Sequence, residues 1–206
     1  MPEPLMKTWW DLHPDWEVLV WPCSQLQVVW RRSRFGWVKE CQPTAGWKNQ
    51  SQIDACFSWA AKADIIRYEI LYRYGGIFVD ADSECVRALD ERFLLPEVWC
   101  CYENEAYAGK RLANGYLGSV PGSSLMKDLV EACAEVQPQE VTDLLTRIAK
   151  GHPELDIFQA RTMMPLHYSG TLAPGSATVF AVQHWHGTVG VRRDSNGRML
   201  GNERWI

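Results

Sequence analysis

Two aspartates, Asp80 and Asp82, follow an apolar run and are separated by one residue. Successive side chains of an extended chain point to opposite faces, so we expect the two carboxylates to share one face. Two like charges beside a dry core are costly unless a cation or hydrogen-bond donors neutralise them. A hard divalent ion, Mn²⁺ or Mg²⁺, would relieve this repulsion and could also neutralise a diphosphate. The alternative is an ordinary surface turn, because Asp-x-Asp often occurs by chance.

A second pair of charged residues, Asp64 and Arg67, precedes the aspartates in the sequence. Their i, i+3 spacing places them on one side of a helix, where an exposed ion pair contributes about half a kcal/mol or less. The segment that carries them leads through Gly75 and Gly76 directly into the apolar run before Asp80. The pair is therefore a candidate for ligand contact as well as for a surface ion pair.

The residues around these charges predict a helix followed by a buried strand. Residues 58–74 have apolar side chains at spacings of three and four, which gives one apolar stripe. Gly75 and Gly76 end this helix, because glycine tolerates the left-handed backbone of a helix terminus. Ile77–Val79 is apolar throughout, which is typical of a parallel strand covered on both faces.

The rest of the chain predicts further alternation of helices and strands. We expect strands at 15–21, 98–102 and 177–182, helices at 24–34, 123–137 and 141–150, and a loop at 42–52. This alternation favours an α/β fold, in which ligands bind beyond the carboxyl ends of the strands. The length suits one domain over residues 1–206.

Composition and charge exclude several classes of protein. The formal net charge is −4, and the only cluster of basic residues is Arg31, Arg32 and Arg34, which argues against nucleic-acid binding. No apolar run reaches the ~18 residues that span a bilayer, and the amino terminus lacks the pattern of a secretion signal. Seven cysteines without Cys-x-x-Cys spacing fit a reducing compartment, so we expect a cytoplasmic location.

Eleven tryptophans are many for this length. Most are expected to pack in the core. Indole faces also stack on sugar rings and nucleobases, so their number mildly favours a carbohydrate or nucleotide ligand.

The stretch AAKADIIRYEILYRYGGIFVDADSECVRALD, residues 60–90, resembles the signature of the DXD-containing glycosyltransferases. This family includes yeast initiating α-1,6-mannosyltransferases, α-1,4-galactosyltransferases and, more distantly, the glucosylating domains of clostridial toxins. Three flanking segments are similar to further motifs of the family in the same order: WDLHPDWEVLVW at 10–21, NGYLGSVPGSSLMKD at 114–128 and QHWHGT at 183–188.

The resemblance implies a GT-A-like nucleotide-diphospho-sugar transferase fold, with a Rossmann-like mixed sheet flanked by helices. It implies a metal-dependent, retaining hexosyltransferase of polysaccharide biosynthesis. Such an enzyme moves a hexose from a UDP- or GDP-sugar to a glycan or other hydroxyl acceptor, with Mn²⁺ or Mg²⁺ as cofactor.

The resemblance also implies roles for individual residues. Asp82 would be a direct metal ligand, and Asp80 would reach the metal through water or bind the ribose and the donor sugar. Asp64 and Arg67 would hold donor-sugar hydroxyls, and Arg67 could approach the diphosphate, so that Asp80, Asp82 and Arg67 form the catalytic set. Asn114 would border the sugar pocket. His184 would be a late metal or diphosphate contact, with His186 as its substitute and a buried core histidine as the plain alternative.

The chain departs from the family pattern at several points. The usual first strand, of the form Ile-Pro-Lys-x-Ile-His-x-x-Trp, is not found. Phe78 stands where tyrosine is frequent, Val189 stands where tryptophan is usual, and no Gly-Pro turn occurs near residues 160–164. These departures keep open a catalytically inactive nucleotide-sugar or carbohydrate-binding domain. An Asp-x-Asp phosphohydrolase is a weaker alternative, because Glu84 replaces the expected threonine or valine and no Asp-Asp pair follows.

Overall fold

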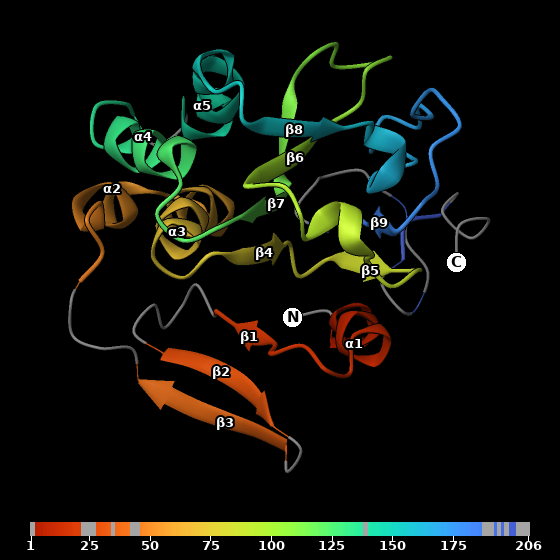
Figure 1. Ribbon diagram of the computed structural model, residues 1–206, viewed down its shortest axis with the longest axis horizontal. Helices are drawn as coiled ribbons and strands as arrows, with labels where there is room; N and C mark the ends of the chain where they lie inside the picture. The colour runs from red at the N-terminus through yellow and green to blue at the C-terminus, as the bar shows by residue number, and fades with distance from the viewer. Residues whose placement is uncertain are drawn as a thin grey trace.

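A mixed four-stranded sheet forms the centre of the computed structural model, in the order β4-β7-β6-β8 (Figure 1). Its strands are β4 (Gly76–Val79), β6 (Val98–Tyr102), β7 (Leu112–Ser119) and β8 (Leu155–Phe158). β7 pairs antiparallel with both β4 and β6, whereas β6 and β8 are parallel. The predicted combination of a mixed sheet with helices is confirmed.

The structure describes residues 3–21, 28–33, 36–41, 46–137, 140–186, 192, 195 and 198–200. The predicted helix start at 24–27, the loop at 42–45 and Val189 lie outside these residues. Within the described part of the chain, no helix is both long and apolar enough to cross a membrane.

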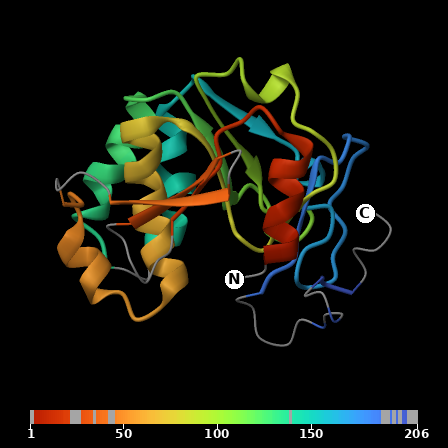
Figure 2. The same ribbon diagram turned by 90° about the horizontal axis from the view of Figure 1, so that it is seen from below.

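Four helices cover one face of the sheet (Figures 1 and 2): α2 (Gln50–Ala55), α3 (Trp59–Tyr74), α4 (Ser124–Cys133) and α5 (Val141–Ile148). Apolar side chains from each helix form one buried cluster with Val98 and Cys100 of β6. The opposite face of β6 presents Trp99 and Cys101 to a second buried cluster. Because side chains alternate along a strand, β6 supplies both cores of the molecule.

The second core lies beneath α1 (Glu3–Leu12), which Figure 2 shows on the side of the sheet away from α3. Trp9 of α1 packs there with Phe93 of the short 3₁₀ helix η1 (Glu91–Phe93) and with Phe180. Two antiparallel strands, β5 (Ser83–Cys85) and β9 (Ala181–Gln183), complete this side. The indole N–H of Trp9 donates to the carbonyl of Ser83 at 3.1 Å, so α1 is fixed to β5.

Three remaining strands form a separate antiparallel sheet: β1 (Leu19–Val20), β2 (Val28–Ser33) and β3 (Gly36–Cys41). Two further short 3₁₀ helices are η3 (Ala149–Gly151) and η4 (Ala160–Thr162).

The predicted helix over 58–74 is confirmed as α3, and its ends follow local rules. The Ser58 hydroxyl accepts from the amide of Ala61 at 3.1 Å and caps the first turn. Gly75 has φ +67° and donates its amide to the carbonyl of Leu71 at 2.9 Å, which ends the helix.

Several other predicted elements need correction. The predicted helix over 24–34 is wrong for its described residues, because residues 28–33 are strand β2, paired with β3. Residues 77–79 do form a strand, but β4 is a half-buried edge strand paired antiparallel, not a doubly covered parallel strand. The strands expected at 15–21 and 177–182 are shorter than predicted, at Leu19–Val20 and Ala181–Gln183.

Candidate active site

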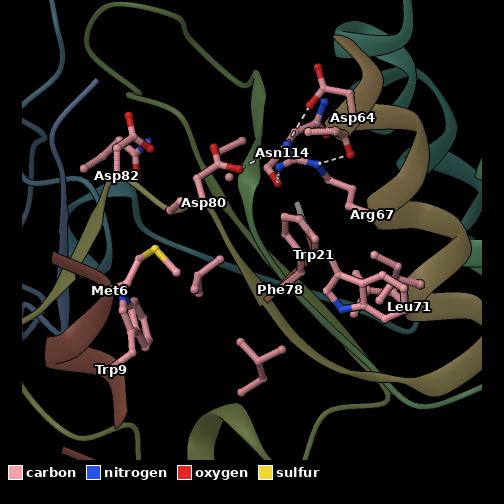
Figure 3. A pocket seen from close by; sticks show the side chains of 18 of the residues that line it. Met6, Trp9, Trp21, Asp64, Arg67, Leu71, Phe78, Asp80, Asp82 and Asn114 are labelled. Atoms are coloured by element: carbon pink, nitrogen blue, oxygen red, sulfur yellow. Dashed lines mark hydrogen bonds and ion pairs between the residues drawn. The ribbon is translucent and has the colours of Figure 1, made fainter. Parts of the chain in front are cut away.

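Arg67 bridges two carboxylates on the floor of a cleft (Figure 3). Its Nη2 lies 3.0 Å from an oxygen of Asp64 and 3.1 Å from an oxygen of Asp80. The Nε of Arg67 donates to the carbonyl of Ala63 at 3.2 Å, and its guanidinium carbon lies 4.8 Å from the centre of the Phe78 ring. With 3% of its surface exposed, the arginine is a fixed positive centre rather than a mobile surface group.

An irregularity in β7 provides a further contact for Arg67. The register between β6 and β7 shifts between Cys100 and Tyr102, so the segment around Asn114 and Gly115 bulges out of the ladder. The carbonyl of Asn114 thereby accepts a hydrogen bond from Nη1 of Arg67. The carbonyl of Gly115 accepts one from the amide of Asp80 at 3.1 Å. The bulge thus links the arginine of α3 to the aspartate after β4.

Gly115 also leaves room for the Asp80 carboxylate. A Cβ atom at position 115 would lie 2.9 Å from Oδ2 of Asp80, closer than ordinary contacts allow. Only glycine at this position lets the Asp80 side chain keep its place.

Asn114 lines the cleft, but its side chain forms hydrogen bonds within the protein. Its Oδ1 accepts from the hydroxyl of Tyr68 at 2.8 Å, and its Nδ2 donates to the carbonyl of Thr142 at 3.3 Å. The residue is 8% exposed. Its main structural effect is to hold the bulge that Arg67 contacts.

Asp82 does not share a strand face with Asp80, so this part of the prediction is wrong. β4 ends at Val79, and the amide of Ser83 donates to the carbonyl of Asp80 at 3.0 Å, which makes residues 80–83 a turn. The turn directs the Asp82 carboxylate away from Arg67, as Figure 3 shows. Both aspartates nevertheless line the same cleft.

The Asp82 carboxylate is held from the carboxy-terminal part of the chain. Its Oδ1 accepts from the side-chain amide of Gln183 at 2.7 Å, and its Oδ2 accepts from the backbone amide of His186 at 2.6 Å. β9 therefore places the second aspartate, although the two segments are far apart in sequence.

Burial raises the pKa of Asp82 above its ordinary value, and the charge of Asp80 raises it further, against the hydrogen bond from His186. Burial likewise raises the pKa of Asp64, although Arg67 opposes that change. Ionising the carboxyl groups of Asp64 and Asp82 is therefore costly, and a bound cation would stabilise their charged forms.

His184 lies outside the cleft wall. Its ring is fully buried, with Nε2 at 2.9 Å from Glu84 and Nδ1 accepting from the amide of Met199 at 2.7 Å. His186, which we named as its substitute, does line the cleft. The structure therefore brings Asp64, Arg67, Asp80, Asp82 and Asn114 together and leaves His184 behind β9.

The cleft has a volume of about 1090 Å³, which exceeds that of a typical drug-sized pocket. Its charged floor is flanked by aromatic side chains from the amino-terminal segment, from α3 and β4, and from the carboxy-terminal part of the chain. They are Trp9, Trp10, Trp16, Trp21, Trp59, Tyr74, Phe78, Tyr168 and Trp185. Aromatic walls around a few charged groups suit a ligand that combines rings with an anionic group.

Among the described residues, no group of three or more histidine, cysteine or acidic side chains is arranged to hold a metal ion. The carboxylates of Asp80 and Asp82 are still suitable ligands for Mn²⁺ or Mg²⁺. Such ions are usually bound by one or two carboxylates together with substrate phosphates and water, not by a complete cage of protein ligands. The oxygens of Asp82 and Asp80 supply that number of hard donors.

The sequence of this region matches a known family. Residues 3–99 match the family described as the glycosyltransferase sugar-binding region containing the DXD motif. The predicted resemblance to DXD glycosyltransferases is confirmed. The matched residues include α1, Asp64, Arg67 and the Asp80-Ala81-Asp82 motif, whereas Asn114 and His184 lie beyond them.

Similar proteins are named glycosyltransferases. The chain is 30% identical over 111 residues to inositol phosphoceramide mannosyltransferase 2 of Schizosaccharomyces pombe. The aligned residues are 54% of this chain and 27% of that protein. It is 26% identical over 126 residues to human alpha-1,4-N-acetylglucosaminyltransferase, covering 58% and 34%. The chain thus spans about a third or less of the length of these relatives. No solved structure matches it.

Sequence reasoning missed two residues that shape this DXD site. Gln183 donates a hydrogen bond to Asp82. It directly precedes His184 in the QHWHGT motif, so that motif could have identified it from the sequence. Thr142 donates its hydroxyl to Asp64 at 3.3 Å. Nothing in the local sequence distinguishes this threonine from other residues at the start of a helix.

Proposed function

We propose that the chain is a single GT-A-like hexosyltransferase domain that is metal-dependent and retaining. It would transfer a hexose from a UDP- or GDP-sugar to a hydroxyl acceptor. The observation that carries the proposal is Arg67, fixed between Asp64 and Asp80 on the floor of the cleft that also receives Asp82. The match to the DXD glycosyltransferase region supports it.

The names of the relatives indicate which donors to test. They describe transfer of mannose and of N-acetylglucosamine, so GDP-mannose and UDP-N-acetylglucosamine join UDP-glucose and UDP-galactose as donors to test. The aromatic walls of the cleft would stack on the nucleobase.

The fixed arginine gives Asp64 and Asp80 defined orientations. Each carboxylate has about four positions that accept hydrogen bonds, so each can accept a hydrogen bond from a hydroxyl of the donor sugar while it stays paired with Arg67. The guanidinium also contributes positive charge beside the diphosphate. Positioned groups that need no rearrangement during the reaction account for much of enzymatic rate enhancement.

Asp82, with Asp80, would hold a Mn²⁺ or Mg²⁺ ion. When bound, the ion would neutralise the diphosphate of the donor and make it a better leaving group. Gln183 and the amide of His186 keep the Asp82 carboxylate in place for this purpose.

In the proposed reaction, the bond between the sugar C1 and the diphosphate oxygen breaks. A new bond forms from the acceptor oxygen to C1 on the same face, and the acceptor proton goes to the departing phosphate oxygen. No side chain of the site is then needed as a covalent nucleophile. This mechanism agrees with the contacts of Asp80, because its carboxylate already pairs with Arg67. An Asp-x-Asp phosphohydrolase would need that same carboxylate as its nucleophile.

The test is Mn²⁺-dependent release of nucleoside diphosphate from the four donors, with Asp82→Asn alongside. We expect one donor to be consumed and the variant to be at least ~10-fold slower, because a charge-stabilising contact is lost. Its free energy of unfolding should change by less than about 1 kcal/mol, since the lost hydrogen bond is offset by relief of repulsion with Asp80. Asp54→Asn, an exposed change outside the cleft, is the control.

Other outcomes identify the alternatives. Nucleotide binding without sugar release would indicate a catalytically inactive binding domain. Turnover of p-nitrophenyl phosphate with Mg²⁺ would favour the phosphohydrolase. A wild-type rate for Asp82→Asn would contradict the proposed role of the aspartate pair.

A further inference from the structure

An aromatic cluster lies at the end of the cleft next to Asp82. The ring centres of Tyr168 and Trp185 are 5.2 Å apart in an edge-on arrangement, and His167 packs 3.9 Å from Tyr168 and 5.1 Å from Trp185. Tyr168 and Trp185 line the same cleft as Asp82. The cluster is therefore continuous with the proposed reaction centre.

Trp185 is held in an unusual backbone conformation. Its φ is +55°, the one positive value of a non-glycine residue in the part of the chain that the structure describes. Such conformations are unfavourable for a large side chain and are concentrated at ligand sites. The residues on either side are fixed in place, because Gln183 and the amide of His186 both bind the Asp82 carboxylate. The indole N–H donates to the carbonyl of Leu166 at 3.3 Å, which fixes the ring as well.

Polar groups surround these rings. Glu103 and Arg111 also line the cleft, and their side chains pair at 3.3 Å. The second oxygen of Glu103 lies 3.2 Å from the ring of His167. A hydrogen bond to Tyr107 and partial burial raise the pKa of Tyr168, so its hydroxyl stays neutral and can both donate and accept hydrogen bonds.

We propose that Tyr168 and Trp185 form an acceptor subsite for a pyranose ring. The C–H face of the sugar would pack on the two aromatic rings, and its hydroxyls would contact Glu103 and Arg111. Sugars present both an apolar face and a ring of hydroxyls, which is the combination this end of the cleft provides. The inference rests on the proposed function, because an acceptor hydroxyl must reach the sugar carbon activated beside Asp80 and Asp82.

The test measures two kinds of binding on the same protein samples. Saturation-transfer NMR with methyl α-D-mannopyranoside and methyl β-D-glucopyranoside reports on the subsite. Calorimetry with GDP or UDP and Mn²⁺ reports on the donor side. We expect one glycoside to bind the wild type, and Trp185→Ala and Tyr168→Ala to weaken it about three- to tenfold, as expected for one aromatic contact. Trp185→Phe should retain most of the binding.

Phe57→Ala is the matched control, because Phe57 is fully exposed and lies outside the cleft. It should leave glycoside binding unchanged. Since Trp185 is partly buried, thermal unfolding is recorded for each variant. If Trp185→Ala does not fold, the more exposed Tyr168→Ala decides the question.

The outcomes separate the inference from the proposed function. Equal glycoside binding by wild type and both alanine variants, or binding of neither glycoside by the wild type, overturns the acceptor subsite while nucleotide binding stands. Loss of GDP and UDP binding from both alanine variants, with glycoside binding unchanged, would mean that the rings belong to the donor site and also overturns it. Absence of nucleotide binding by the wild type contradicts the proposed function, whatever the glycosides show.

Discussion

At the scale of single residues, the site depends on one arginine that forms ion pairs with two carboxylates. Arg67 directs four of its five N–H groups to Asp64, Asp80 and the carbonyls of Ala63 and Asn114. A lysine has the same charge but presents it at one point, so it cannot span two carboxylates with the geometry of a guanidinium.

We therefore predict that Arg67→Lys lowers Mn²⁺-dependent donor turnover at least ~10-fold, because one acid loses its fixed orientation. It should also lower the free energy of unfolding by roughly 1 to 3 kcal/mol, since a buried carboxylate loses a partner. Turnover and urea unfolding measure the two effects. Arg73→Lys is the control, because Arg73 lies on the same helix, pairs with Glu69 at 3.0 Å and does not line the cleft. Equal turnover by the two variants would disprove the special role of Arg67.

The identity of the acids could be predicted from sequence, but their directions could not. Asp80 and Asp82 were recognisable because they follow an apolar run and match a known motif. Strand alternation then placed them on one face, whereas the turn from Asp80 to Ser83 separates them. The turn forms because the following residues pair with β9, about a hundred positions later, which local patterns do not contain.

At the scale of elements, the junction of α3 and β4 sets the distance between Arg67 and the aspartates. α3 was predictable because its apolar stripe, serine cap and terminal glycine are local signals. β7 was not, since LANGYLGS contains an Asn-Gly pair that is more typical of a turn than of a strand. Here the pair forms the bulge at the site, and pairing with β4 and β6 overrides the local preference.

The junction provides a prediction with an internal control. Gly75 and Gly76 both have positive φ, so alanine at either position costs about 1 kcal/mol or more in backbone strain. At Gly75 a Cβ would also lie 2.6 Å from Cδ of Pro121 and 2.9 Å from the carbonyl of Ser119, whereas at Gly76 nothing lies within 4 Å. We expect Gly75→Ala to lower the free energy of unfolding by about 1 kcal/mol more than Gly76→Ala, and to reduce donor turnover further. Identical urea midpoints for the two variants would contradict this packing argument.

At the scale of the whole molecule, a partly buried ion pair between Arg198 and Glu84 connects the end of the described chain to the strand after the DXD turn. Arg198 contacts both oxygens of Glu84 in β5, the closest at 2.8 Å, and His184 contacts one of them at 2.9 Å. These partners are about a hundred positions apart, so sequence patterns could not predict their contact. The cluster lies directly behind Asp82, whose carbonyl accepts from the amide of His184 at 3.0 Å.

This cluster makes stability depend on pH in a defined direction. Burial alone would raise the pKa of Glu84, but hydrogen bonds from His184 and Arg198 outweigh it and hold the pKa below its ordinary value of 4.5. A carboxylate with a lowered pKa in the folded state stabilises the fold fully above the unfolded pKa, and this contribution is lost as pH falls through the folded pKa. The ionised Glu84 should therefore stabilise the protein above pH 4.5 and progressively less below it.

We predict that Glu84→Gln lowers the free energy of unfolding by about 1 to 3 kcal/mol at neutral pH, because a charged hydrogen-bond partner of Arg198 is lost. The difference from wild type should shrink as pH falls below 4.5, where the wild-type glutamate itself becomes protonated. Urea unfolding of both proteins between pH 7 and about pH 3 measures this, with the exposed Glu135→Gln as control. A difference that stays constant or widens in acid would show that Glu84 does not stabilise the fold through its charge. If the difference does shrink, donor turnover of Glu84→Gln at neutral pH would then show how much the placement of Asp82 depends on this distant contact.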